Sequence, residues 1–418
     1  MFRIRQRFPR PRAGDVRAAV KGELERLFPK GRIRPGAEIG VTVGSRGISH
    51  IDTIARAAVD FLKSRDARPF IIPAMGSHGG ATAEAQTHLI AHYGVTEETM
   101  GCPVRAAMET RSLGKSRHGV DARLAEAAFQ SDGILLVNRV KPHTDYKGPI
   151  ESGLTKICAI GLGKYDGARE IHRHLFDVGL GEAIRGVTEK ILASGKVIGG
   201  LAILENAYHE TARVAGVGPE GFFDAEMALL EESRGLMGRL PIDEIDVLLC
   251  DRMGKNISGA GLDTNIVGRS VYGYTHGVPW MDGMPGIVRI VVDDLAEESD
   301  GNAVGMGMVE FITERFAAKI DHRVTSINAM TACAPMGART PVVLPSTREA
   351  LAGAIRTCRL RPEGPRVVYV RDTLELEDVL CSEACLPLVE GREGIDVLSA
   401  PEPLEFDGAG YVRSPYAK

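Results

Sequence analysis

Several common features are missing from this chain, and each absence excludes a class of protein. The formal net charge is −4 and no basic block occurs, so no positive surface for nucleic acid is predicted. No apolar run approaches the roughly 18 residues that a membrane-spanning helix needs. The first residues, Met-Phe-Arg-Ile-Arg-Gln, lack the apolar core of a signal peptide. We therefore expect a cytoplasmic protein that binds neither nucleic acid nor a membrane.

Cysteine is sparse and scattered, which favours a reducing environment over a disulfide framework. The chain has seven cysteines. Cys381 and Cys385 are four residues apart and would share one face of a helix. Neither a second pair nor a histidine cluster accompanies them, so we interpret them as a buried pair rather than a metal site.

The length and composition predict an ordinary globular protein with more than one core. Hydrophobic residues make up 44% and charged residues 25% of the 418 positions. A new strand begins near Ile242, and Arg361-Pro-Glu-Gly-Pro is a boundary signal. We predict a cofactor-binding domain at 1–240, a second domain at 241–365, and a C-terminal segment at 366–418 that packs back on the first domain.

Strand-like and helix-like segments alternate along the chain. This alternation predicts an α/β fold with two domains, mostly parallel sheets and helices on both faces of each sheet, with the active site in the cleft between the domains. The expected strands are 38–43, 68–75, 133–140, 242–251, 286–292 and 366–370, and the clearest helices are 51–62 and 84–93, the latter ended by Gly94.

Three expected strands end in chemically active residues. Gly-Ser-Arg46 follows the first, Gly-Ser-His78 the second and Lys-Pro-His143 the third. Such strand ends converge on the ligand crevice of an open α/β sheet. Histidine suits acid and base catalysis near neutral pH. Two histidines on opposite sides of a substrate carbon could each handle a proton, as inversion of a stereocentre requires.

A lysine and a further histidine follow these strands. Lys156 ends Ser152-Gly-Leu-Thr-Lys, and apolar neighbours would make its amine nucleophilic. His172 and His174 are two apart in an expected helix, so at most one points into a given site. His172 is the candidate metal ligand. Zinc held by His172 and the two strand-end histidines is an alternative, although no HExxH pattern is present.

The second expected domain contributes a glycine-rich loop, Gly-Lys255-Asn256-Ile-Ser-Gly-Ala-Gly-Leu-Asp-Thr-Asn. It lacks the residue order of a nucleotide phosphate loop. A flexible polar loop and a wall of the active cleft both remain open, and the second reading makes Lys255 and Asn256 substrate contacts.

Taken in order, these motifs resemble the nickel-dependent lactate racemase (LarA) family. That family carries a Gly-x-His turn after a strand, a second strand ending in Pro-His or Ser-His, a Ser-Gly loop ending in lysine, and a downstream histidine. Here the matching residues are His78, His143, Lys156 and His172. The resemblance covers most of the chain and is specific from about residue 38 to residue 175.

The resemblance implies a nickel pincer nucleotide, a thiolated pyridinium mononucleotide that binds nickel through two sulfurs and a carbon. Lys156 would hold it as a thioamide in the loop of Ser152 and Gly153, and His172 would ligate nickel. The two strand-end histidines would act as alternate bases toward a 2-hydroxy acid whose C2 hydride moves to the cofactor and returns to the other face.

Three departures from the family pattern bear on the substrate. Val43 stands where the family has an acidic residue, three positions before Arg46, the expected substrate contact. The loop from 144 to 155 is longer. The second-domain Tyr-Gln…Lys substrate motif is absent, and residues 261–269 replace it, with Arg269 as the expected cation. We therefore predict a racemase or epimerase of a 2-hydroxy acid other than lactate, larger or dicarboxylic.

Two other functional classes remain open from the sequence. One is a binding protein that sequesters a small acid or a metal without turnover, and the other is a zinc hydrolase that uses the three histidines. The resemblance also implies cofactor-maturation proteins as partners.

Overall fold

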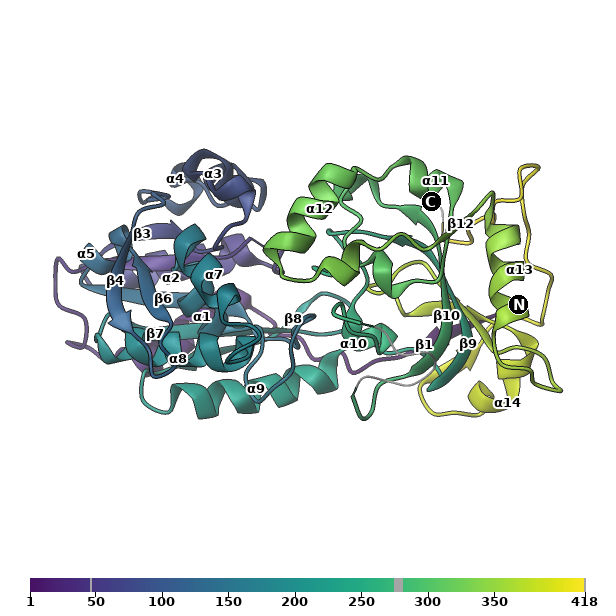
Figure 1. The fold of residues 1–418 in the computed structure, drawn as a ribbon. Coiled ribbons are helices and arrows are strands. Elements are labelled where there is room, and N and C mark those ends of the chain that lie inside the picture. The colour runs from purple at the N-terminus through teal and green to yellow at the C-terminus, as the bar shows by residue number, and fades with distance from the viewer. Residues whose placement is uncertain (46, 274–280, 417–418) are drawn as a thin grey trace. The chain divides into compact units, whose positions relative to one another are not determined.

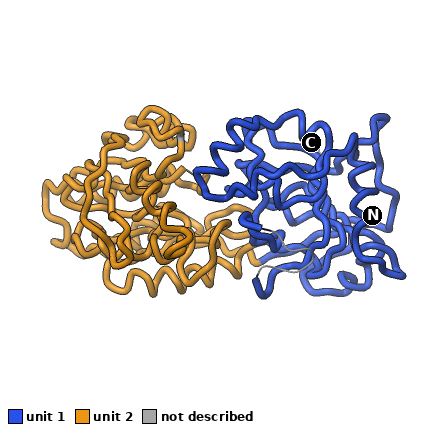
Figure 2. Tube along the Cα trace, viewed as in Figure 1, with its two compact units in different colours: residues 1–8, 238–418 blue, residues 9–237 orange. Residues whose placement is uncertain are grey.

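The computed structural model describes residues 1–45, 47–273 and 281–416, and the chain forms two compact units (Figure 2). One unit is residues 9–237, and the other combines residues 1–8 with 238–418. The expected first domain therefore loses its first eight residues. Residues 366–418 belong to the unit that contains 238–365, and two of their strands pair with residues 2–6, which the expected first domain included.

A five-stranded sheet forms the centre of the 9–237 unit, in the order β3-β2-β6-β7-β8 (Figure 1). Neighbouring strands run parallel except β7 and β8, which are antiparallel. The strands are β2 (Glu38–Val43), β3 (Arg68–Pro73), β6 (Gly133–Arg139), β7 (Val197–Glu205) and β8 (Thr211–Val217). A separate hairpin pairs β4 (Thr110–Lys115) with β5 (Asp121–Ala125).

Helices connect these strands, as the alternation in the sequence predicted. They are α1 (Val16–Leu27), α2 (Ile51–Lys63), α3 (Ala83–His92), α4 (Glu97–Met100), α5 (Glu126–Gln130), α6 (Leu154–Lys156), α7 (Lys164–Arg173), α8 (Leu180–Ala193) and α9 (Phe222–Leu236). Gly94 follows α3 with φ of +80°, a conformation that glycine adopts without a Cβ penalty. Among the described helices, none is long and apolar enough to cross a membrane.

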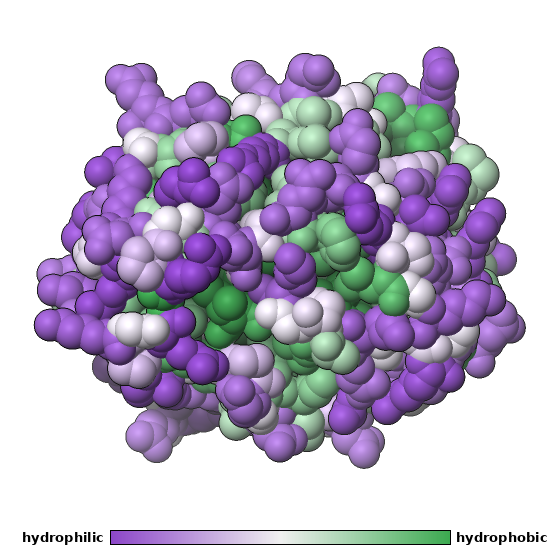
Figure 3. Space-filling view, turned by 90° about the vertical axis from the view of Figure 1, so that its left-hand side faces the viewer, coloured by the Kyte–Doolittle hydropathy of each residue, from purple (hydrophilic) through white to green (hydrophobic). Residues whose placement is uncertain are grey.

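The central strands are apolar on both sides because the sheet is covered on both faces. Along β6, Ile134 and Leu136 belong to one buried cluster, whereas Leu135 and Val137 belong to the other. This explains the continuous apolar runs that predicted buried parallel strands. The apolar side chains are largely enclosed, and the face of this unit seen in Figure 3 is mainly hydrophilic.

An eight-stranded sheet organises the other unit, in the order β12-β11-β10-β9-β13-β14-β1-β15. The strands from β12 to β13 are parallel, and β14, β1 and β15 are antiparallel to their neighbours. They are β1 (Phe2–Gln6), β9 (Glu244–Met253), β10 (Gly286–Leu295), β11 (Phe311–Thr313), β12 (Val342–Leu344), β13 (Val367–Val370), β14 (Asp378–Cys381) and β15 (Ile395–Val397). The helices are α10 (Thr264–Val267), α11 (Glu314–Ala318), α12 (His322–Thr331), α13 (Thr347–Thr357) and α14 (Leu386–Val389).

The two spaced cysteines form a buried pair, although not on one helix face. Cys381 ends β14, and Cys385 lies in a 3₁₀ turn at Glu383–Cys385. A hydrogen bond between the two thiols raises the pKa of Cys381 well above its ordinary value and lowers that of Cys385.

Candidate active site

The candidate site begins at one edge of the five-stranded sheet, where neighbouring parallel strands end. β3, β2 and β6 are adjacent, so the segments after them leave from the same edge. Ser45 follows β2, and its hydroxyl makes a short hydrogen bond with Nδ1 of His78 after β3. His143 follows β6. Arg46, the expected substrate contact, lies outside the described residues.

A buried lysine and glutamine hold the turn that carries His78. The amide Nε2 of Gln86 donates to the carbonyl oxygens of Gly76 and His78 at 2.9 and 3.1 Å. Nζ of Lys164 donates to the carbonyl of Pro73 at 2.7 Å and to Oε1 of Gln86 at 3.2 Å. Both side chains are buried, whereas the His78 side chain is exposed. The turn is therefore fixed from inside, and its histidine points outward.

Burial also changes the protonation of this lysine. Desolvation lowers the pKa of Lys164 to about 8, against a smaller opposing effect of Glu109. Lys164 has φ of +54°, which a non-glycine residue adopts only at a cost of order 1–3 kcal/mol. The hydrogen bonds from Nζ to Pro73 and Gln86 offset this backbone cost. Sequence reasoning missed this residue.

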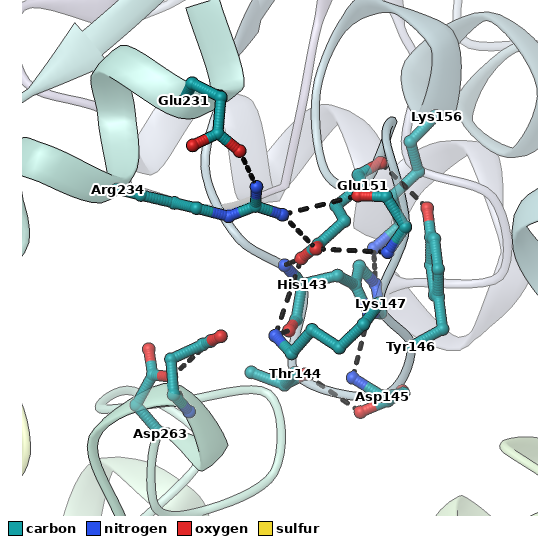
Figure 4. A network of polar contacts seen from close by, with 12 residues as sticks. His143, Thr144, Asp145, Tyr146, Lys147, Glu151, Lys156, Glu231, Arg234 and Asp263 are labelled. Atoms are coloured by element: carbon teal, nitrogen blue, oxygen red, sulfur yellow. Dashed lines mark hydrogen bonds and ion pairs between the residues drawn. The ribbon is translucent and has the colours of Figure 1, made fainter. Parts of the chain in front are cut away.

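His143 is buried, and each of its polar groups has a defined partner (Figure 4). Its backbone N–H donates to Oε2 of Glu151 at 2.5 Å. Its ring Nδ1 accepts from the backbone N–H of Asp145 at 2.9 Å. Its Nε2 is hydrogen-bonded to Nζ of Lys156 at 2.5 Å. Two of the predicted site residues, His143 and Lys156, thus meet directly.

The loop that carries His143 is stabilised by a buried carboxylate. The Glu151 side chain is completely buried, and its Oε1 accepts from Nη2 of Arg234 on α9 at 2.7 Å. Lys147 lies 3.4 Å from Oε2 of Glu151 and donates to the carbonyl of His143 at 2.5 Å. The Tyr146 hydroxyl donates to the Glu151 carbonyl at 2.7 Å, and its ring centroid is 4.4 Å from that of His143. The longer loop noted in the sequence is therefore ordered by its own charges and Arg234.

Lys156 is positioned by the start of the short helix α6. Oε2 of Glu226 accepts from the backbone N–H of Thr155 at 2.9 Å and also from the Thr155 hydroxyl. The amide Nδ2 of Asn138 donates to the carbonyl of Gly153 at 2.8 Å. A Cβ on Gly153 would lie 1.9 Å from Oε1 of Glu226, so only glycine fits there. Burial raises the pKa of Glu226 to about 7, against the opposing hydrogen bonds from Thr155.

The residues around Lys156 continue this tight arrangement. Ser152 exchanges two backbone hydrogen bonds with Lys141, at 2.9 and 3.2 Å, and so closes the loop. A π-helical turn, Ile157–Gly161, follows Lys156. Such turns are rare in proteins overall, and those that occur often lie at functional sites.

His172 lies on α7 with its tautomer defined by a backbone contact. Nδ1 donates to the carbonyl of Ala168 at 2.7 Å, which leaves the lone pair of the neutral ring on Nε2. Burial lowers the pKa of His172, against the opposing hydrogen bond with Ala168, and an ammonium group on Lys156 would lower it further. Asp145 acts in the opposite direction. His172 is therefore close enough to both residues to respond to their charge, and His174 ends α7 beside Glu170 instead.

Lys255 and Asn256 follow β9 in the other unit, as the sequence predicted for that loop. Nζ of Lys255 donates to the carbonyl of Gly259 at 2.5 Å, and Asn256 is exposed. Their substrate contact stays a prediction.

Arg269 does not have the surroundings expected of a substrate cation. Its side chain is 1% exposed, and its guanidinium lies 3.0 Å from the carboxylate of Glu310. The same group donates to backbone carbonyl oxygens of Met308, Ile287 and Val288. The expectation that Arg269 binds substrate is wrong, because a buried arginine with these partners neutralises a buried carboxylate. Arg269 therefore does not supply the second cation that a dicarboxylic substrate would need.

No group of three or more His, Cys, Asp or Glu side chains in the described part of the chain is arranged to hold a metal ion. The three histidines thus do not form the ready zinc site that the hydrolase alternative requires.

Comparisons with known proteins agree with this geometry at the level of fold. No family model and no curated protein sequence matches the chain. The lactate racemase apoprotein from Thermoanaerobacterium thermosaccharolyticum is similar over 89% of this chain and 94% of its own, with 13% identity and a TM-score of 0.50. A Thermotoga maritima protein is similar over 86% of this chain and 96% of its own, with 12% identity and a TM-score of 0.51.

The likeness is one of fold. It extends over nearly the whole of both solved chains and confirms the predicted class, a mixed α/β protein with large, mostly parallel sheets.

Proposed function

We propose that this chain is an isomerase, a LarA-like racemase or epimerase of a 2-hydroxy acid. The observation that carries the proposal is the direct contact of His143 with Lys156, beside His172 and at the sheet edge from which His78 also leaves. These are the four residues that match the family motifs in order. The fold likeness to a lactate racemase apoprotein supports the same reading.

The residues of the site fit a nickel pincer nucleotide. Lys156 would hold it covalently, within the loop of Ser152 and Gly153. His172 would supply the protein ligand to nickel through Nε2, since its Nδ1 donates to the Ala168 carbonyl, an arrangement that is common for metal-binding histidines. When bound, the group would supply the acceptor for the C2 hydride of the substrate.

His78 and His143 would hold and move the proton of the substrate hydroxyl. The exposed His78 ring can exchange protons with water, and its Nδ1 contacts the Ser45 hydroxyl. His143 is buried and has its Nδ1 occupied by the Asp145 N–H. A base role for His143 therefore requires the proton to leave Nε2, and hence a shift of the Asp145 amide. Arg46 would contact the substrate carboxylate.

We infer a substrate other than lactate from the departures from the family pattern, chiefly the missing Tyr-Gln…Lys motif. A panel of enantiopure 2-hydroxy acids, incubated with protein matured alongside cofactor-maturation proteins and separated by chiral chromatography, tests both the reaction and the substrate. Inversion of at least one acid is expected. Binding of an acid without any inversion would favour the alternative of a sequestering protein.

Cofactor attachment is tested independently by mass. Protein matured with the cofactor should carry added mass on the peptide that contains Lys156, and Lys156→Ala should lose it. Lys21→Ala, which changes an exposed lysine on α1, is the control and should keep it. An unmodified Lys156 in fully active protein would overturn this assignment.

The paired histidines make a second kinetic test. His78→Ala and His143→Ala should each lower turnover by roughly 10²-fold or more, in both directions equally, because a catalyst cannot change the equilibrium between enantiomers. His88→Ala, on the exposed side of α3, should leave turnover unchanged. Wild-type turnover in either of the first two variants contradicts the model.

A further inference from the structure

We propose that His143 is a positioning residue for cofactor attachment, which holds Lys156 as a neutral amine ready to attack an acyl or thioacyl carbon. This inference deepens the proposed function and rests on it for the identity of the ligand. It assigns His143 a task that precedes any proton transfer with substrate.

The hydrogen bonds of His143 determine its tautomer. A backbone N–H can only donate, so the Asp145 N–H at 2.9 Å requires a lone pair on Nδ1. A neutral imidazole has one lone pair and one N–H, so the proton is on Nε2. Nε2 therefore donates to Nζ of Lys156 at 2.5 Å. An ammonium group has no acceptor, and Lys156 in this contact must be the neutral amine.

The neighbouring Lys147 shows the opposite arrangement and is a natural internal comparison. Its Nζ donates to the His143 carbonyl at 2.5 Å and lies 3.4 Å from the Glu151 carboxylate. Both partners are acceptors and one is a carboxylate, which favours the ammonium form of Lys147. Lys156 thus contacts the ring Nε2 of His143 and is stabilised as a neutral amine, whereas Lys147 contacts the backbone carbonyl of His143 and is stabilised as an ammonium ion.

Other charged or titratable groups surround His143 and Lys156, and they come from each element that packs against the two residues. The loop contributes Asp145 and Glu151, α7 contributes His172, and α9 contributes Glu226 and Arg234. Glu151 is neutralised by Arg234 at 2.7 Å, and Glu226 is bonded to Thr155. Both carboxylates are thus engaged by other donors, and the contact that we invoke for the Lys156 amine is the one with His143.

The attachment step balances without an oxidant or reductant. The Nζ lone pair would attack the carbon of a thiocarboxylic acid, so that the C–N bond forms, the C–O bond breaks and the sulfur stays on the carbon. The oxygen would leave with an amine proton as water, and Lys156 would become a thioamide. A thioamide nitrogen has no basic lone pair, so the hydrogen bond from Nε2 ends. Attachment therefore releases His143 from Lys156 and makes its ring available for substrate.

Chemical labelling of the protein expressed without cofactor-maturation proteins tests the proposal. Limiting acetic anhydride is added at several pH values from 6 to 10, and acetylation of each lysine is followed by peptide mass spectrometry. An ordinary lysine is only about one part in 10³ neutral at pH 7.5. Lys156 should therefore label about 10²-fold or more faster than Lys147 at that pH, and its rate should rise little toward pH 10.

Variants at His143 separate the specific effect from a general loss of structure. His143→Ala should slow Lys156 labelling by at least about 10-fold at pH 7.5. His143→Gln, whose amide N–H can still donate to the amine, should retain most of the wild-type rate. If wild-type Lys156 labels no faster than Lys147, or if His143→Ala labels like the wild type, the proposal is wrong. If His143→Ala does not fold, the ratio of Lys156 to Lys147 labelling in the wild type and the labelling rate of His143→Gln still test the proposal.

The assay needs neither cofactor nor substrate, so its outcome is distinct from that of the proposed function. Fast Lys156 labelling in a protein without racemase activity would contradict the proposed function and support the role of His143 toward Lys156. Racemase activity with slow, ordinary Lys156 labelling would contradict that role of His143 and support the proposed function.

Discussion

Replacing Glu226 with glutamine should remove a pH-dependent weakness at the base of the site. Glu226 is buried and accepts hydrogen bonds from the backbone and hydroxyl of Thr155, next to Lys156. A glutamine carbonyl oxygen in the place of Oε2 can accept from both the Thr155 N–H and the Thr155 hydroxyl. The substitution therefore keeps the shape and the contacts while removing the ionisation.

The magnitude follows from the pKa of this carboxyl. Burial raises it from 4.5 to about 7. Because the folded state then binds the proton more tightly than the unfolded state, stability falls as the pH rises from about 4.5 to about 7. At about 1.4 kcal/mol for each pH unit, the full effect is about 3 kcal/mol and is present above pH 7. Glu226→Gln should lose this dependence.

Hydrogen exchange followed by mass spectrometry is the suitable assay, because it reports on α6 and α9 without unfolding both units. Wild type and variant are compared at the same pH, so that the intrinsic exchange rate cancels. Protection of peptides from 150–160 and 222–236 in the variant, relative to the wild type, should rise between pH 5 and pH 8. Glu232→Gln, an exposed position on the same helix, is the matched control and should change little.

A ratio of variant to wild-type protection that stays constant with pH would refute this prediction. If Glu226→Gln and wild type differ by the same amount at pH 5 and pH 8, the carboxyl does not titrate in that window. A ratio that falls with pH would reverse the sign of the linkage.

The remaining predictions concern three other buried contacts. Gly153→Ala should cost about 1–3 kcal/mol and slow cofactor attachment, measured by thermal unfolding and intact mass, because its Cβ would lie 1.9 Å from Oε1 of Glu226. The pKa of Lys164, about 8, predicts that the stability of wild type relative to Lys164→Met rises from about pH 8 to pH 10.5, since burial penalises the ammonium form at lower pH; a flat difference in hydrogen exchange would exclude this. Arg269→Ala should destabilise the protein by about 3–5 kcal/mol because it removes the cation beside the buried Glu310 carboxylate. Measured at an equal folded fraction, the ratio of the rates on different hydroxy acids should be the same in the variant and in the wild type.

Much of the fold could be predicted from the sequence because its signals are local. A continuous apolar run indicates a strand buried on both faces, and the expected strand 38–43 is β2 with the same bounds. Parallel strands share an edge, so residue order alone was enough to place His78 and His143 at the same sheet edge, although β2 separates the two strands that they follow. The spacing that put His172 and His174 on different faces needed only helical geometry.

The tertiary structure decided what depends on residues far apart in the chain. β1 pairs with β14 in the second unit, across more than 370 positions, and no local pattern indicates that partner. Lys164 reaches Gln86 and Glu226 reaches Thr155 across 78 and 71 residues. The sequence neighbours of Arg269 do not reveal Glu310, 41 residues away, and this is why a substrate contact was wrongly expected. Residue type and periodicity determine which side chains can react, whereas burial and hydrogen-bond partners, set only when the chain folds, decide which of them carry charge.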